Sequence, residues 1–130
     1  PYDVGLGRFV DLEKADFLGK ESLAKVCKIN KLWGIRINNG IAKKSFFYSE
    51  RGNLLGKVTS STWSPYLHCG VGIVRVNDPS TTPGTTIVVD GIDGKTYKGQ
   101  ICKLPMYDVE GLIVRGKNKV IPTEPQPWVV

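Results

Sequence analysis

The amino-acid sequence predicts a mainly β protein, a small antiparallel barrel of about six strands with one N-terminal helix. Fifteen glycines and eight prolines are scattered along the 130 residues without a repeat, which is typical of a chain with many turns. Apolar residues follow helical spacing in one early segment, and a spacing of two residues takes over after it. One helix followed by five or six short strands favours a small barrel or a sandwich, and we expect the barrel.

The helix is expected over residues 20–28, because Leu23, Val26 and Cys27 recur there at helical spacing and turn-forming residues precede them. Residues 5–12 place their apolar side chains too irregularly for a helix. Their two glycines favour an extended or turning entry into the domain.

The first strand is expected to end at Ile37, because the dipeptide Asn39-Gly40 that follows is typical of hairpin turns. Turn-forming residues also separate the other expected strands, which lie at 46–49, 53–62, 70–76, 86–89 and 95–103. We expect residues 1–115 to form the barrel domain. Residues 116–130 contain three prolines and are expected to form an extended tail.

The composition fits one globular domain, with 41% hydrophobic and 23% charged residues. The formal net charge of +6 suits a small anionic partner. The basic residues are spread along the whole chain instead of forming a stripe with aromatic residues, so we expect no nucleic-acid partner. No apolar run approaches the ~20 residues of a membrane span, so we expect no membrane partner.

The cysteine pattern predicts reduced thiols and a cytoplasmic protein, because three cysteines stand at wide spacing. Cys69 and Cys102 lie in apolar strand segments and are expected in the core. His68 directly precedes Cys69, so in a strand the two side chains point to opposite faces, and we expect an ordinary surface or loop histidine. No set of ligands fits zinc, and we expect neither a metal site nor a catalytic residue. Because the sequence starts at Pro1, we expect it to be the tail of a longer chain.

One stretch, residues 56–67, is a candidate functional corner. It runs from a strand through several hydroxyl residues to Trp63 and then to Tyr66. Aromatic side chains with a polar atom suit a flat heterocyclic ligand or a partner surface, and they also commonly plug the end of a barrel. Both alternatives are open from the sequence.

Six short motifs, in this order and spacing, extend over nearly the whole chain. They are GLG at 5–7, DFLGKESL at 16–23, GKVTS with WSP at 56–65, GVGI at 70–73, PGT at 83–85 and LPMYD at 104–108. The sequence resembles the C-terminal domain of the glycine-cleavage T-protein family. That family contains aminomethyltransferases, the folate domains of dimethylglycine and sarcosine dehydrogenases, and dimethylsulfoniopropionate demethylases.

The resemblance implies the C-terminal, cavity-closing domain of a tetrahydrofolate-dependent methyl or aminomethyl transferase. Tetrahydrofolate and the catalytic aspartate then belong mainly to preceding N-terminal domains, so the isolated chain is expected to be inactive. A lipoyl carrier protein or a flavin dehydrogenase domain is an expected partner, and the location in a eukaryote is the mitochondrial matrix. The alternative is a stand-alone ligand- or protein-binding barrel.

Within this resemblance, four residues are expected to face tetrahydrofolate: Trp63, Tyr66, Tyr107 and Arg115. The arginine is included because a guanidinium fork binds a carboxylate through two parallel hydrogen bonds. Lys20, at the start of the expected helix, is the candidate contact to a partner.

Overall fold

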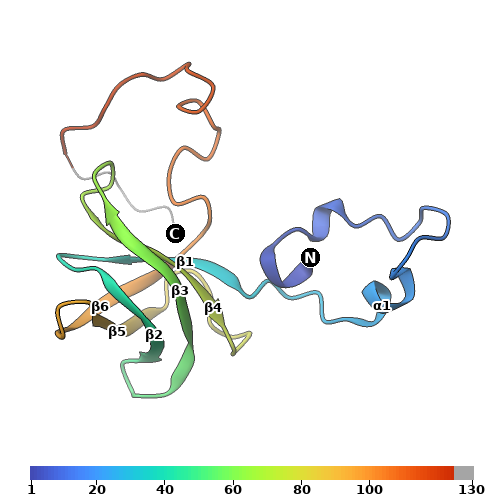
Figure 1. Ribbon diagram of the computed structural model, residues 1–130, viewed down its shortest axis with the longest axis horizontal. Coiled ribbons are helices and arrows are strands. Elements are labelled where there is room, and N and C mark those ends of the chain that lie inside the picture. The colour runs from blue at the N-terminus through green and yellow to red at the C-terminus, as the bar shows by residue number, and fades with distance from the viewer. Residues whose placement is uncertain (125–130) are drawn as a thin grey trace.

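The computed structural model describes residues 1–124. Within them, six antiparallel strands close into a barrel in the order β1-β4-β3-β2-β5-β6, and β6 pairs again with β1 (Figure 1). The strands are β1 (Leu32–Ile37), β2 (Ala42–Ser49), β3 (Leu54–Ser64), β4 (Cys69–Val76), β5 (Thr86–Gly91) and β6 (Thr96–Cys102). The predicted fold class is confirmed.

The core fills the barrel, because every strand turns alternate side chains inward. The buried apolar residues include Ile35, Ile37, Phe47, Val58, Val74, Val89 and Ile101. Gly56 makes room for the largest of them, since a Cβ at Gly56 would lie 2.8 Å from the Phe47 ring and 2.2 Å from the Arg75 carbonyl oxygen. Trp33 and Tyr97 are half-buried and pack against this core.

Most observed strand bounds differ from the predicted ones by one or two positions, and the start of β2 differs by four. β2 begins at Ala42, four positions before the expected start, and its register against β5 shifts between Ala42 and Phe47. Lys43 and Lys44, both exposed, interrupt the alternation of apolar and polar residues that would have indicated a strand here. β3 continues to Ser64 and so includes Trp63, because a register shift between Val58 and Ser60 lets the strand continue along β4.

Residues 1–30 form an N-terminal arm that stands to one side of the barrel (Figure 1). It contains two 3₁₀ turns, η1 (Tyr2–Val4) and η2 (Gly7–Phe9), and the helix α1 (Lys20–Lys25). The turning entry is therefore confirmed, but the prediction that the helix reaches residue 28 is wrong. Val26 adopts extended backbone, and α1 contains no buried residue that could hold further turns in place.

The C-terminal segment, residues 103–124, leaves β6 and arches over the barrel (Figure 1). The Leu104-Pro105 peptide bond is cis. The Asp108 carboxylate accepts hydrogen bonds from the backbone N–H groups of Leu112 (2.7 Å) and Ile113 (3.1 Å), which shapes the following loop. The expected domain boundary at residue 115 falls within this segment, and the end of the expected tail lies outside the described residues.

Candidate functional site

A groove of about 490 Å³ lies on the outer face of β3 and β4. Its floor is made by outward-facing residues that pair across the two strands, Thr62 with Val71 and Ser60 with Ile73. Its other wall is the start of the C-terminal segment, residues 104–107. We call it the outer groove.

The C-terminal segment lies close to the barrel because β1 carries a glycine beneath it. A Cβ at Gly34 would lie 2.9 Å from the Cε of Met106 and 2.8 Å from the Sγ of Cys102. A side chain at this position would have to displace the tip of the Met106 side chain. Gly34 therefore lets the groove's second wall pack closely on β1.

Two predicted site residues meet at the end of the outer groove. The rings of Tyr66 and Tyr107 stack with their centroids 4.7 Å apart and an interplanar angle of 20°. Tyr107 lines the groove, and Tyr66 is half-buried beyond it. Stacked tyrosines present a rigid apolar surface with hydroxyl groups at its rim, which suits a flat ligand or a partner surface.

Trp63 lies in β3, three positions before Tyr66, and its side chain is 40% exposed. It pairs with Gly70 of β4, whose position faces into the barrel, so Trp63 lies on that same face near the end of the barrel. The barrel plug and the ligand-facing corner therefore both stay predictions.

The structure places Arg115 and Lys20 away from the lining of the outer groove. The Arg115 Nε donates a hydrogen bond to the Gly111 carbonyl oxygen (2.9 Å), and its Nη2 donates to the Glu110 carbonyl oxygen. The Lys20 Nζ donates to the Lys14 carbonyl oxygen at 2.7 Å, within the N-terminal arm. Their predicted roles stay predictions.

The outer groove is suited to binding a ligand and not to acid–base chemistry at neutral pH. Its described lining residues carry hydroxyl and apolar groups, with no carboxylate, imidazole or amine among them. His68 is exposed in the turn between β3 and β4, as expected for a surface residue. Within residues 1–124, no three His, Cys, Asp or Glu residues gather as a metal site. No helix of this described part is long and apolar enough to span a membrane.

Cys69 and Cys102 are buried, which confirms the expectation from the sequence. Burial raises the pKa of the Cys102 thiol to about 11, although the positive charge of Arg36 partly offsets this. The thiol therefore stays protonated at neutral pH, and it is a packing residue instead of a nucleophile.

The apolar wall of the outer groove was not predicted from the sequence, although β4 carries a signal for it. Gly70 and Gly72 point inward, whereas the larger Val71 and Ile73 point outward. A strand with its small residues inside and its branched residues outside needs cover on the outer face. The segment 104–107 provides part of that cover.

The barrel and its outer groove define a closed six-stranded β domain, and comparison with known proteins places it in a family. The family model "Glycine cleavage T-protein C-terminal barrel domain" matches residues 30–108. An aminomethyltransferase of Prochlorococcus marinus (strain NATL1A) is 36% identical over 112 residues, covering 82% of this chain and 30% of that protein. One of Halothermothrix orenii is 33% identical over 109 residues, covering 81% of this chain and 30% of that protein.

A solved structure shows the same fold. The glycine cleavage system aminomethyltransferase T from Bartonella henselae matches with a TM-score of 0.64 and 25% identity, covering 81% of this chain and 31% of that one. The chain therefore belongs to the glycine cleavage T-protein C-terminal barrel family. It spans about 30% of the length of the curated relatives that it matches.

Proposed function

We propose that this chain is the C-terminal, cavity-closing domain of a tetrahydrofolate-dependent transferase of aminomethyl or methyl groups. The observation that carries the proposal is the family match over residues 30–108, together with relatives named aminomethyltransferases. Those relatives are about three times as long as the matched part. The domain is residues 1–115, and the catalytic carboxylate and most folate contacts belong to preceding domains.

The aromatic residues singled out above suit the flat rings of tetrahydrofolate, which accepts the one-carbon unit when bound. Tyr66 and Tyr107 form a stacked pair, and Trp63 exposes its indole in the neighbouring strand. These three residues would contact the rings and exclude water from one side of the cavity. Arg115 would hold a carboxylate of the cofactor through guanidinium N–H groups beyond those bonded to its own loop.

The partners in this proposal are the N-terminal folate-binding domains and a carrier of the one-carbon donor, either a lipoyl protein or a flavin dehydrogenase domain. Lys20 is the proposed contact to that carrier, since it lies on the N-terminal arm. Its amine already bonds to the Lys14 carbonyl oxygen, so the carrier contact would use its remaining N–H groups. The location that follows is the cytoplasm, or the mitochondrial matrix in a eukaryote.

The folate contacts are tested in an enzyme that carries this chain as its C-terminal barrel. We expect Trp63→Ala and Tyr107→Ala to weaken tetrahydrofolate binding by about tenfold or more, because each removes a stacked or exposed ring. Arg115→Lys should also weaken it, because an amine lacks the planar fork. The exposed Phe46, on the outer face of β2, offers a matched control in Phe46→Ala. Equal affinity for all four variants would remove these residues from the folate site.

A second candidate is a stand-alone binding barrel. The observation that favours it is the closed barrel with its own core and an outer groove, which needs no other domain to be formed. Measurable binding of a small ligand in the groove by the isolated chain, without any effect of this chain on folate-dependent transfer, would support this candidate over the first.

A further inference from the structure

A second cavity, of about 370 Å³, lies where the N-terminal arm meets the barrel. One wall comes from the arm and includes Arg8, and the opposite wall includes Lys103, which follows β6. Leu32 and Trp33 at the start of β1 line it as well. We call it the junction cavity. It shares only two of its lining residues, Leu104 and Pro105, with the outer groove.

The charge of the junction cavity is positive. Its described lining residues include Arg8 and Lys103 and no carboxylate. The ion pairs found within residues 1–124 join Asp3 to Lys31 and Arg75, and Glu50 to Lys98, so neither lining cation has a carboxylate partner there. The Arg8 guanidinium lies 4.8 Å from the centre of the Phe9 ring. That contact uses none of the five guanidinium N–H groups as a hydrogen bond to a carboxylate, so they can serve an anion.

The remaining lining of the junction cavity is largely apolar. The half-buried indole of Trp33 packs against the barrel core, and Leu32 and Leu104 add aliphatic surface. A bare inorganic anion would leave this apolar surface in contact with water. We propose that the junction cavity binds a small oxyanion, a carboxylate or a phosphate, carried on an aromatic body, with Arg8 and Lys103 holding the oxyanion and Trp33 contacting the ring.

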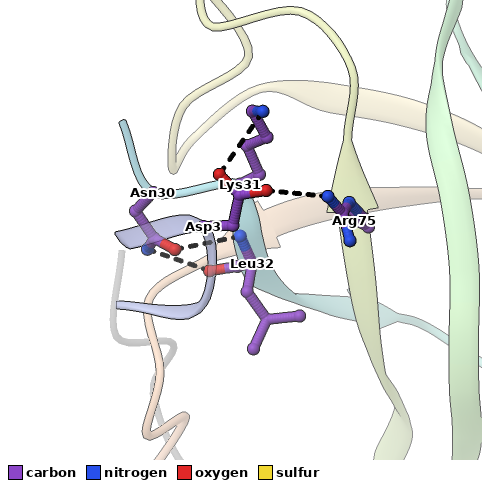
Figure 2. A network of polar contacts seen from close by, with 5 residues as sticks. All are labelled: Asp3, Asn30, Lys31, Leu32 and Arg75. Atoms are coloured by element: carbon purple, nitrogen blue, oxygen red, sulfur yellow. Dashed lines mark hydrogen bonds and ion pairs between the residues drawn. The ribbon is translucent and has the colours of Figure 1, made fainter. Parts of the chain in front are cut away.

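The geometry of the junction cavity depends on Asp3, which fixes the base of the arm to the barrel (Figure 2). The Asp3 carboxylate lies 2.7 Å from the Arg75 Nη2 and 3.4 Å from the Lys31 Nζ. The Lys31 backbone N–H also donates to the Asp3 carbonyl oxygen at 2.8 Å. Because Arg8 belongs to the arm and Lys103 begins the C-terminal segment directly after β6, the spacing of the two cations depends on how the arm is attached to the barrel. Asp3 is therefore a positioning residue.

The proposal is tested by NMR titration of the 130-residue chain with three probes of similar shape: benzoate, phenyl phosphate and neutral benzamide. We expect the two anions to shift the Gly5 amide and Trp33 indole signals saturably, and benzamide to shift them far less. The tighter of the two anions then identifies the oxyanion as carboxylate or phosphate. Equal binding of benzamide, or no saturable shift with any probe, would overturn the proposal.

Charge variants locate the binding within the junction cavity. Arg8→Gln and Lys103→Gln should each weaken binding of the preferred anion by about tenfold, because each removes a charge-assisted hydrogen bond. Arg8→Lys, which keeps the charge, should weaken anion binding less than Arg8→Gln does. Lys43→Gln removes an exposed cation of β2 that does not line the cavity. It should leave the affinity for the anion unchanged. If Lys43→Gln has the same effect as Arg8→Gln, the anion responds only to net charge and the proposal fails.

The Asp3→Asn variant shows whether Asp3 acts by positioning the arm or only through its charge, because the two roles change anion affinity in opposite directions. Removing a negative charge next to an anion site strengthens binding if Asp3 acts only through its charge. We expect weaker binding instead, because the arm loses its attachment to Lys31 and Arg75. Tighter binding by Asp3→Asn would contradict the positioning role. These experiments read ligand binding alone, so their failure would leave the proposed transferase function untouched.

Discussion

The barrel and the N-terminal arm differ in how far they bury their apolar side chains. In the barrel, Ile35, Phe47 and Ile101 are completely buried. In the arm, neither 3₁₀ turn and no part of α1 contains a buried residue, and Phe9 and Leu18 are mostly or fully exposed. Closing a sheet lets short strands form a complete core, whereas a six-residue helix has too little surface to form one.

Stability should therefore be concentrated in the barrel, and the arm should open locally at much lower cost. The arm's exposed apolar side chains are also what a surface that contacts other domains requires. This agrees with the proposed role of the chain within a longer enzyme.

The largest expected effect compares two adjacent phenylalanines of β2. Phe47 is completely buried, while Phe46 is 51% exposed on the outer face. Phe47→Ala should lower the free energy of unfolding by about 3–5 kcal/mol, because it leaves a cavity in the core. Phe46→Ala, the matched control, should cost less than about 1 kcal/mol. Urea unfolding measures both, and similar losses for the two variants would contradict the assignment of the core.

The second effect is the dependence of the free energy of unfolding on pH that the buried Cys102 thiol causes. Its pKa is about 11 in the folded protein and 9.0 for an ordinary thiol, so the folded state retains the proton more tightly than the unfolded state. The stabilisation is fully present below pH 9 and is lost as the pH rises to 11. The loss amounts to roughly 2–3 kcal/mol.

The control for this pH effect is Cys102→Ala, which has no thiol to titrate. Urea unfolding between pH 8 and 11 should show a steeper fall for the unmodified chain than for Cys102→Ala. Parallel curves for the two proteins would show that the thiol at position 102 titrates normally in the folded state.

The third effect separates two tryptophans. Trp33 is half-buried and packs against the core, whereas Trp63 is 40% exposed. Trp63→Ala should cost about 1 kcal/mol of stability in the isolated chain, and Trp33→Ala about 3 kcal/mol. Thermal unfolding of the two variants gives the comparison. A larger loss for Trp63→Ala than for Trp33→Ala would favour the barrel plug over the ligand-facing corner.

The smallest effect on stability is expected at the base of the arm. Asp3→Asn breaks two partly exposed ion pairs, so the free energy of unfolding should fall by less than about 1 kcal/mol. Hydrogen exchange should nevertheless become faster at the Lys31 amide, which bonds to the Asp3 carbonyl oxygen. Amides of the barrel strands, such as those of Ile35 and Ile101, should keep their protection. Faster exchange across the barrel would mean that the arm contributes to the core.

The sequence was sufficient to predict the barrel because its signal is local. Alternating apolar residues and hairpin turns specify each strand, whereas the strand number alone fits either a barrel or a sandwich. The end of the helix was harder, because Val26 fits helical spacing but nothing packs against the residues that would continue α1. The start of β2 was hidden by the exposed Lys43 and Lys44.

The candidate sites could be predicted only in part, because they join residues far apart in the sequence. Tyr66 and Tyr107 were each singled out, but their stacking depends on how the C-terminal segment folds back over β1. The junction cavity was missed altogether. Arg8 and Lys103 belong to no shared motif, and they come together because Asp3 fixes the arm to the barrel.

The central claim is that this chain completes a transferase without catalysing the transfer itself. The most direct test measures tetrahydrofolate-dependent aminomethyl transfer by a chimera in which residues 30–108 replace the matching C-terminal barrel of the Prochlorococcus marinus aminomethyltransferase. We expect transfer by the chimera, none by that enzyme without its barrel, and none by the 130-residue chain alone. Turnover by the chain alone, or a folded chimera without activity, would contradict the claim.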